Sequence, residues 1–101
     1  MALDFHNADT NEYLFGLNDS QYANLDVIFV TFKNKSGVFI DPYRDTKLSV
    51  VNQKAIIQII EVYINKNDLN ANKQQTIDIL EFCTLMKYFS SKEMDLKTQG
   101  D

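Results

Sequence analysis

The stretch LDVIFVTFKNKSGVFID, from Leu25 to Asp41, combines the longest apolar run of the chain with turn-forming residues directly after it. Residues 27–30 are consecutive β-branched or aromatic residues, a pattern that favours a strand covered on both faces. Residues 33–37 (KNKSG) contain Asn34 and Gly37, which tolerate the positive φ angles of a tight turn. The sequence therefore predicts a β-hairpin from Leu25 to Asp41, ended by Pro42, around which the other elements are organised.

The length and composition predict one globular domain. The chain has 101 residues, 45% of them hydrophobic, with three Gly and one Pro. This is enough apolar material for a core, and it argues against disorder or a loop-rich chain. The first residues have no basic region, and no run approaches ~18 apolar residues, so we expect a cytoplasmic protein without a membrane segment. The single cysteine, Cys83, lies in the apolar phrase LEFCTLM, which predicts a buried thiol.

The negative charge is concentrated in the first third of the chain. The net charge is −4, but residues 1–32 hold five acidic residues and no Lys or Arg, which gives −5. The remaining residues hold nine of the 14 acidic residues and all ten basic ones, which gives +1. Because phosphate contacts need clustered Lys or Arg, this distribution argues against direct binding of nucleic acid.

The first 24 residues predict short elements. Leu3 and Phe5 alternate with polar residues, which indicates a short strand. The phrase EYLFGL, residues 12–17, fits a strand or a brief helix, and a strand is favoured because the buried run at 27–30 needs neighbours. Residues 18–20 (NDS) are typical of a turn.

From Ser49 onward the apolar spacing becomes helical. Ser49 is a plausible N-cap for a helix over residues 49–66, and Asn72, with Gln75 three residues later, caps a second helix over residues 73–90. The polar link between the two helices predicts a helical hairpin. Residues 90–93 (SSKE) suggest one more short turn, and the tail over residues 91–101 is expected to fray. The predicted fold is thus α+β: a small antiparallel sheet, made of the hairpin and an N-terminal strand, packed against two C-terminal helices, with the strand order left open.

The sequence lacks signatures of catalysis or metal binding. His6 is the only histidine, and we expect it to be a surface or partly buried residue, with a single acid–base group beside Asp4 or Asp9 as the alternative. The loop from Asp68 resembles the start of a calcium-binding loop, but Lys73 and Ile79 stand where Gly and a bidentate Glu are required. Phosphate-binding loops and the GxSxG, HExxH and CxxC motifs are absent from the sequence. We therefore expect a protein that is not an enzyme and that has no cofactor and no metal.

The acidic, aromatic-bearing first third points to a protein-binding role. Carboxylates gathered without bases repel one another, and one use for them is to meet a basic partner and cover the positive residues with which that partner binds phosphate. The leading hypothesis is a small acidic cytoplasmic inhibitor, specifically a bacterial immunity protein that occludes the cleft of a basic nuclease toxin. The predicted contact residues are Asp4, Asp9, Glu12, Tyr13, Asp19, Tyr22 and Asp26, with Tyr43, Arg44 and Asp45 second.

Three other assignments remain open. The chain could be a non-catalytic subunit or adaptor whose partner covers the sheet edge or the helical hairpin, in which case apolar contacts dominate and salt matters little. It could be a phage-encoded inhibitor that mimics the charge of nucleic acid. In residues 41–45 (DPYRD), the residues Asp41, Arg44 and Asp45 fit either a salt-bridged exit from the sheet or a contact loop. A homodimer is also left open.

Overall fold

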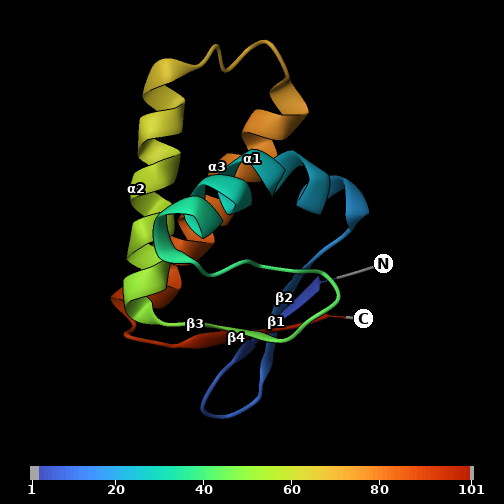
Figure 1. Ribbon diagram of the computed structural model, residues 1–101, viewed down its shortest axis with the longest axis vertical. Helices are drawn as coiled ribbons and strands as arrows, with labels where there is room; N and C mark the ends of the chain where they lie inside the picture. Colours follow the sequence, from blue (N-terminus) through green and yellow to red (C-terminus); the bar gives the residue numbers. More distant parts are fainter. Residues whose placement is uncertain (1–2, 101) are drawn as a thin grey trace.

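The computed structural model describes residues 3–100 and contains one antiparallel sheet and three helices (Figure 1). In chain order the elements are β1 (Leu3–Asn7), β2 (Tyr13–Leu17), α1 (Asp19–Ser36), β3 (Thr46–Leu48), α2 (Val50–Lys66), α3 (Lys73–Ser91) and β4 (Leu96–Gln99). The predicted α+β class is confirmed, as are the N-terminal strand and the strand favoured for residues 12–17. Residues 1, 2 and 101, which belong to the predicted N-terminal segment and tail, lie outside the described residues.

The predicted β-hairpin from Leu25 to Asp41 is wrong, because most of it belongs to helix α1. The turn predicted at residues 18–20 is instead the start of this helix. The Asn18 side chain accepts a hydrogen bond from the Gln21 N–H at 2.9 Å, and Gln21 Oε1 accepts one from the Asn18 N–H at 2.9 Å, which is a complete capping box. At the other end Gly37 adopts φ 79° and its N–H bonds to the Lys33 carbonyl at 2.8 Å, as in a glycine-terminated helix.

The burial along α1 explains the wrong prediction. The buried residues Leu25, Ile28, Phe29 and Phe32 are spaced three and four apart, which places them on one side of a helix. Val27 and Val30, which made the run look continuously buried, lie on the outer side with 39% and 42% of their surface exposed. The apolar run is therefore one helical stripe plus two surface valines.

The sheet has the order β2-β1-β4-β3, with every neighbouring pair antiparallel. The C-terminal strand β4 lies inside the sheet between β1 and β3, so the predictions of a further helical turn and a frayed tail are wrong for residues 92–100. The helix α3 ends at Ser91 with Lys92 as its C-cap, and Glu93 takes a positive φ of 54° that redirects the chain. Leu96 and Thr98 are then completely buried. The segment is mostly polar in sequence, but it forms a strand because every second residue is buried.

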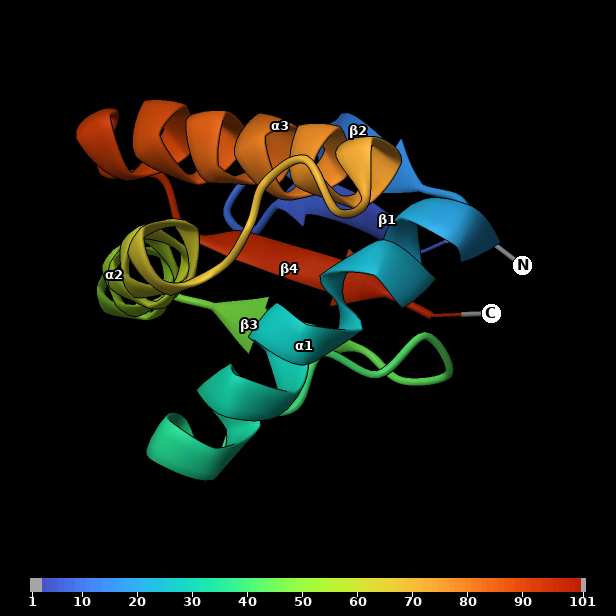
Figure 2. The same ribbon diagram turned by 90° about the horizontal axis from the view of Figure 1, so that it is seen from above.

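The helices all lie on one side of the sheet (Figures 1 and 2), with α3 running over the β2 edge and α1 on the side of β3. The predicted helical hairpin is confirmed as α2 and α3, capped by Ser49 and Asn72. The core between these layers is aromatic: the Phe82 ring lies edge-on to Phe5 at 5.7 Å and to Phe29 at 5.4 Å. Cys83 is 5% exposed, so the predicted buried thiol is confirmed, and burial raises its pKa. Among residues 3–100, no helix has the length and apolarity needed to cross a bilayer.

Candidate functional site

Nine of the ten predicted contact residues fall into two groups, and the tenth, Asp4, lies on the open face of the sheet. Asp9 and Glu12 lie in the turn between β1 and β2, and Tyr13 is the first residue of β2. The other end of β2 leads directly into α1, so the first residues of that helix are about 13 Å further along the strand. The second group gathers there, around the start of α1 and the loop over residues 37–45. The members of this second group are Asp19, Tyr22, Asp26, Tyr43, Arg44 and Asp45.

Tyr22 is the centre of the second group, which we call the Tyr22 face. Its hydroxyl donates a hydrogen bond to the Ile40 carbonyl at 2.6 Å, which ties α1 to the following loop. Burial, and then the nearby carboxylates of Asp26 and Asp41, raise the pKa of Tyr22 to about 12. A cavity of 210 Å³ lies beside the ring. It is lined by Leu3, Leu17, Asp19, Tyr22, Pro42 and Tyr43.

The loop of the Tyr22 face is held in place by its own polar groups. The Tyr43 N–H donates to Asp41 Oδ1 at 2.8 Å, and Arg44 Nε lies 3.9 Å from Asp41 Oδ2. At its end, Asp45 Oδ1 accepts a hydrogen bond from the Gly100 N–H at 3.3 Å. Because Gly100 sits so close that a Cβ would come within 2.6 Å of the Pro42 carbonyl oxygen, strand β4 supports the loop. Tyr43 is nevertheless 66% exposed, so a loop that is held by these hydrogen bonds exposes an aromatic ring to solvent.

The remaining predicted contact residue, Asp4, lies on the open face of the sheet together with Tyr13. A Cβ built on Gly16 would be 2.9 Å from Asp4 Oδ1 and 3.0 Å from the Tyr13 hydroxyl oxygen, so both side chains fold over this glycine. His6 is next to them, with its ring 5.7 Å from the Tyr13 ring. Its Nδ1 is 3.3 Å from the Asn11 carbonyl oxygen, and its buried Nε2 has no hydrogen-bond partner among the described residues. Within residues 3–100 no hydrogen bond joins His6 to Asp4, so the arrangement does not form a proton relay.

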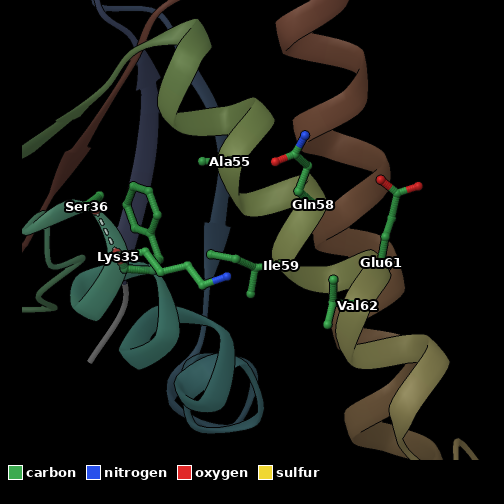
Figure 3. Close-up of a pocket in the computed structure, with 8 residues that line it drawn as sticks. Lys35, Ser36, Ala55, Gln58, Ile59, Glu61 and Val62 are labelled. Atoms are coloured by element: carbon green, nitrogen blue, oxygen red, sulfur yellow. Dashed lines mark hydrogen bonds between the residues drawn. The ribbon is translucent and has the colours of Figure 1, made fainter.

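A groove between α1 and α2 was not predicted from the sequence. One of its walls is the last turn of α1, and these residues were predicted to belong to a β-hairpin. The groove has a volume of 430 Å³ and an apolar floor that includes Phe32 and Ile59. Figure 3 shows Lys35 extending from α1 toward Ile59, whereas Glu61 of α2 points away from Lys35. Across residues 3–100, no ion pair joins these two side chains. The polar groups do not converge on a common point, which is unlike a catalytic pocket.

A second unpredicted feature lies between the edge of β2 and helix α3, which we call the edge groove. It has a volume of 190 Å³. Its lining consists of Phe15, Gly16, Leu17, Gln21, Asp78, Glu81, Phe82 and Leu85. Asp78 is only 6% exposed, and its two oxygens accept hydrogen bonds from Asn24 Nδ2 at 2.7 Å and Gln74 Nε2 at 3.0 Å. The sequence contains one indication of this groove. Asp78 precedes the inward-facing Phe82 by four residues, and residues with this spacing lie on the same face of a helix.

Known proteins and metal chemistry give no further assignment. Groups of three or more His, Cys, Asp or Glu residues that could hold a metal ion are absent from residues 3–100. Comparisons with protein-family models, with curated proteins and with solved structures found no match. The candidate site is therefore defined by its geometry, and the Tyr22 face is the place where six of the ten predicted contact residues lie.

Proposed function

We propose that this chain is an acidic cytoplasmic binding protein that covers a basic surface on another protein, and specifically that it is an immunity protein which occludes the cleft of a nuclease toxin. The observation that carries the proposal is the gathering of carboxylates around Tyr22, next to the exposed ring of Tyr43. Asp26 and Asp41 act electrostatically on Tyr22, while Tyr43 projects beside the 210 Å³ cavity.

The chemistry of this face suits a nuclease cleft. A protein that binds phosphates does so through clustered Lys and Arg, which an acidic face attracts from a distance and then pairs with. Exposed carboxylates mainly accelerate association, whereas a buried aromatic anchor mainly slows dissociation. The Tyr22 face offers both: exposed acids in Asp26 and Asp45, and an aromatic ring in Tyr43 on a loop that needs little ordering.

The first experiment identifies the partner. The tagged chain is expressed in its native source, the proteins that co-purify with it are identified by mass spectrometry, and each is tested for cleavage of DNA and RNA with and without the chain. We expect a basic protein whose nuclease activity the chain abolishes. A partner that is acidic or apolar, and bound with little dependence on salt, would contradict this proposal and favour the role of an adaptor subunit.

The second experiment locates the contact with two variants of equal net charge. The variant Asp26→Asn with Asp45→Asn removes two charges from the Tyr22 face, and the variant Asp9→Asn with Glu12→Gln removes two from the turn between β1 and β2. We expect the first pair to slow association with the partner about ten-fold at low salt and to flatten its salt dependence, and the second pair to act much less. Equal effects of the two pairs would mean that only net charge matters.

A third variant tests the anchor. Tyr43→Ala should raise the dissociation rate about 30-fold, the size expected for an interface hot spot, and should leave the salt dependence unchanged. Because the ring is exposed in the free chain, the fold should not be affected. An unchanged dissociation rate would place the anchor elsewhere.

A further inference from the structure

The edge groove combines an unpaired strand edge with a one-sided charge. β2 is an edge strand of the sheet. In an antiparallel sheet the backbone groups of successive residues point alternately to the two sides. The Ala8 N–H bonds to the Asp95 carbonyl on the β4 side, and the Asn7 N–H bonds to the Glu12 carbonyl on the β2 side. It follows that the backbone N–H and C=O groups of Phe5 and of its register partner Phe15 point toward each other. The N–H and C=O of Gly16 therefore point away from β1, toward the open edge of the sheet.

Above this edge, helix α3 contributes two carboxylates and an apolar floor. Glu81 is exposed, and Asp78 is nearly buried with both oxygens held by neutral side-chain amides. Lysine and arginine are absent from the described residues that line the groove. A buried carboxylate without a cation is costly, and each of its oxygens retains acceptor capacity. The floor next to them is formed by Phe15, Phe82 and Leu85.

We propose that the edge groove binds an extended segment of a partner protein, which adds as a strand to β2 and places a Lys or Arg side chain against Asp78 and Glu81. The outward N–H and C=O of Gly16 select an extended backbone, and because side chains alternate along a strand, every second residue of the segment faces α3. The carboxylates select a basic residue at one position that faces α3, and the apolar floor selects a hydrophobic residue two positions away, on the same side of the segment. The edge groove adjoins the Tyr22 face at Leu17, but the carboxylates and the strand edge that define it are different, and the inference does not depend on the function proposed for the Tyr22 face.

A second copy of this chain suits the groove less well. Pairing β2 with β2 around a two-fold axis would place the same surface on both sides of the contact. The Glu81 and Asp78 carboxylates of the two copies would then approach each other with no lysine or arginine in either groove to separate them. Like charges so placed are destabilising, so the charge of the groove favours a basic partner.

The test uses a fluorescein-labelled heptapeptide that is blocked at both ends. Every second residue, starting with the first, is threonine, and the three residues between them, which face α3, are lysine, valine and lysine. Two control peptides are used: one with glutamate in place of lysine, and one whose backbone is N-methylated on the residues that face β2. Binding is measured by fluorescence anisotropy, and the amide resonance of Gly16 is followed by nuclear magnetic resonance. We expect the lysine peptide to bind and to shift the Gly16 resonance, and both control peptides to bind at least ten-fold more weakly.

Variants of the chain assign the charge recognition. Glu81→Lys changes an exposed residue, so the fold should persist, and it should weaken the lysine peptide about ten-fold while improving the glutamate peptide. Asp78→Asn, checked for folding by circular dichroism, should weaken the lysine peptide as well. The matched control is Asp26→Asn, which removes one charge from the Tyr22 face and should leave peptide binding within about two-fold.

Three results would overturn the proposal. The first is equal binding of the lysine and glutamate peptides. The second is an effect of Asp26→Asn as large as that of Asp78→Asn. The third is a concentration-dependent dimer, detected by sedimentation, in which the Gly16 resonance shifts without peptide, since the occupant would then be a second copy of the chain.

Discussion

The Tyr22 face and the edge groove are both acidic, but they hold their carboxylates in different ways. On the Tyr22 face Asp26 and Asp45 are exposed, so water and salt screen them and their contribution to stability is small. In the edge groove Asp78 is 6% exposed and is fixed by amides from α1 and α3. The comparison shows that the number of charges on a surface does not measure their energetic effect. Exposed charges act at a distance with little cost, whereas a buried charge forms part of the fold.

The largest expected difference between the two regions concerns their aromatic residues. Phe82, in the floor of the edge groove, is 1% exposed and contacts the rings of Phe5, Phe15 and Phe29. Phe82→Ala should lower the free energy of unfolding by about 3–5 kcal/mol, because it leaves a cavity among these rings. Tyr43→Ala on the Tyr22 face should lower it by less than about 0.5 kcal/mol, the range of ordinary surface substitutions. Urea denaturation of both variants measures the difference, and comparable losses would show that the loop of the Tyr22 face is part of the core.

The next expected effect separates the two kinds of carboxylate. Asp78→Ala removes the acceptor for Asn24 Nδ2 and Gln74 Nε2 at the contact of α1 with α3. We expect a loss of about 1–3 kcal/mol, the cost of leaving partly buried donors without a partner. The matched variant Asp26→Ala changes an exposed residue and should stay within about 0.5 kcal/mol of the wild type. Thermal and urea unfolding measure both. A loss for Asp26→Ala as large as for Asp78→Ala would remove the distinction between the two regions.

The elements that the sequence predicted correctly are those with a local signal that tertiary packing did not contradict. Helices α2 and α3 have N-cap residues, Ser49 and Asn72, followed by a helical apolar spacing, and both signals agree with the structure. For α1 the local signals were also present: Asn18 with Gln21 is a capping box, and Gly37 is a C-cap. Val27 and Val30 fill the gaps in the apolar stripe, so the run has the pattern of a strand despite these caps. A continuous apolar run indicates a strand covered on both faces only if all of its residues are buried, and the burial of a single residue cannot be deduced from the local sequence.

Strand β4 and the edge groove could not be predicted for a different reason. The phrase LKTQ is short and mostly polar, and it becomes a strand because β1 and β3 bond to both of its sides. Its burial depends on contacts that are distant in sequence, such as that of Asp4 with Gln99. The edge groove in turn needs α3 to lie over β2. For the Tyr22 face, the charge pattern of the sequence places all acidic residues of the first third in one group. It cannot separate Asp9 and Glu12 from the residues of α1, because that separation is set by the length of β2.

The smallest effect concerns Tyr22, which joins α1 to the loop of the Tyr22 face. Tyr22→Phe removes the hydrogen bond from its hydroxyl to the Ile40 carbonyl and should lower the free energy of unfolding by about 0.5–1.5 kcal/mol at neutral pH.

The same hydroxyl of Tyr22 makes stability depend on pH. Burial and the nearby Asp26 and Asp41 raise its pKa to about 12 in the folded chain, while tyrosine in an unfolded chain ionises near pH 10. Between these values the unfolded chain has released a proton that the folded chain retains, so this contribution is complete below pH 10 and is lost as the pH rises through 12. Urea denaturation from pH 8 to 12 should therefore show a steeper loss of stability for the wild type than for Tyr22→Phe. If the free energy of unfolding falls in parallel with pH for the two proteins, the Tyr22 hydroxyl is as accessible to water as the exposed acids around it.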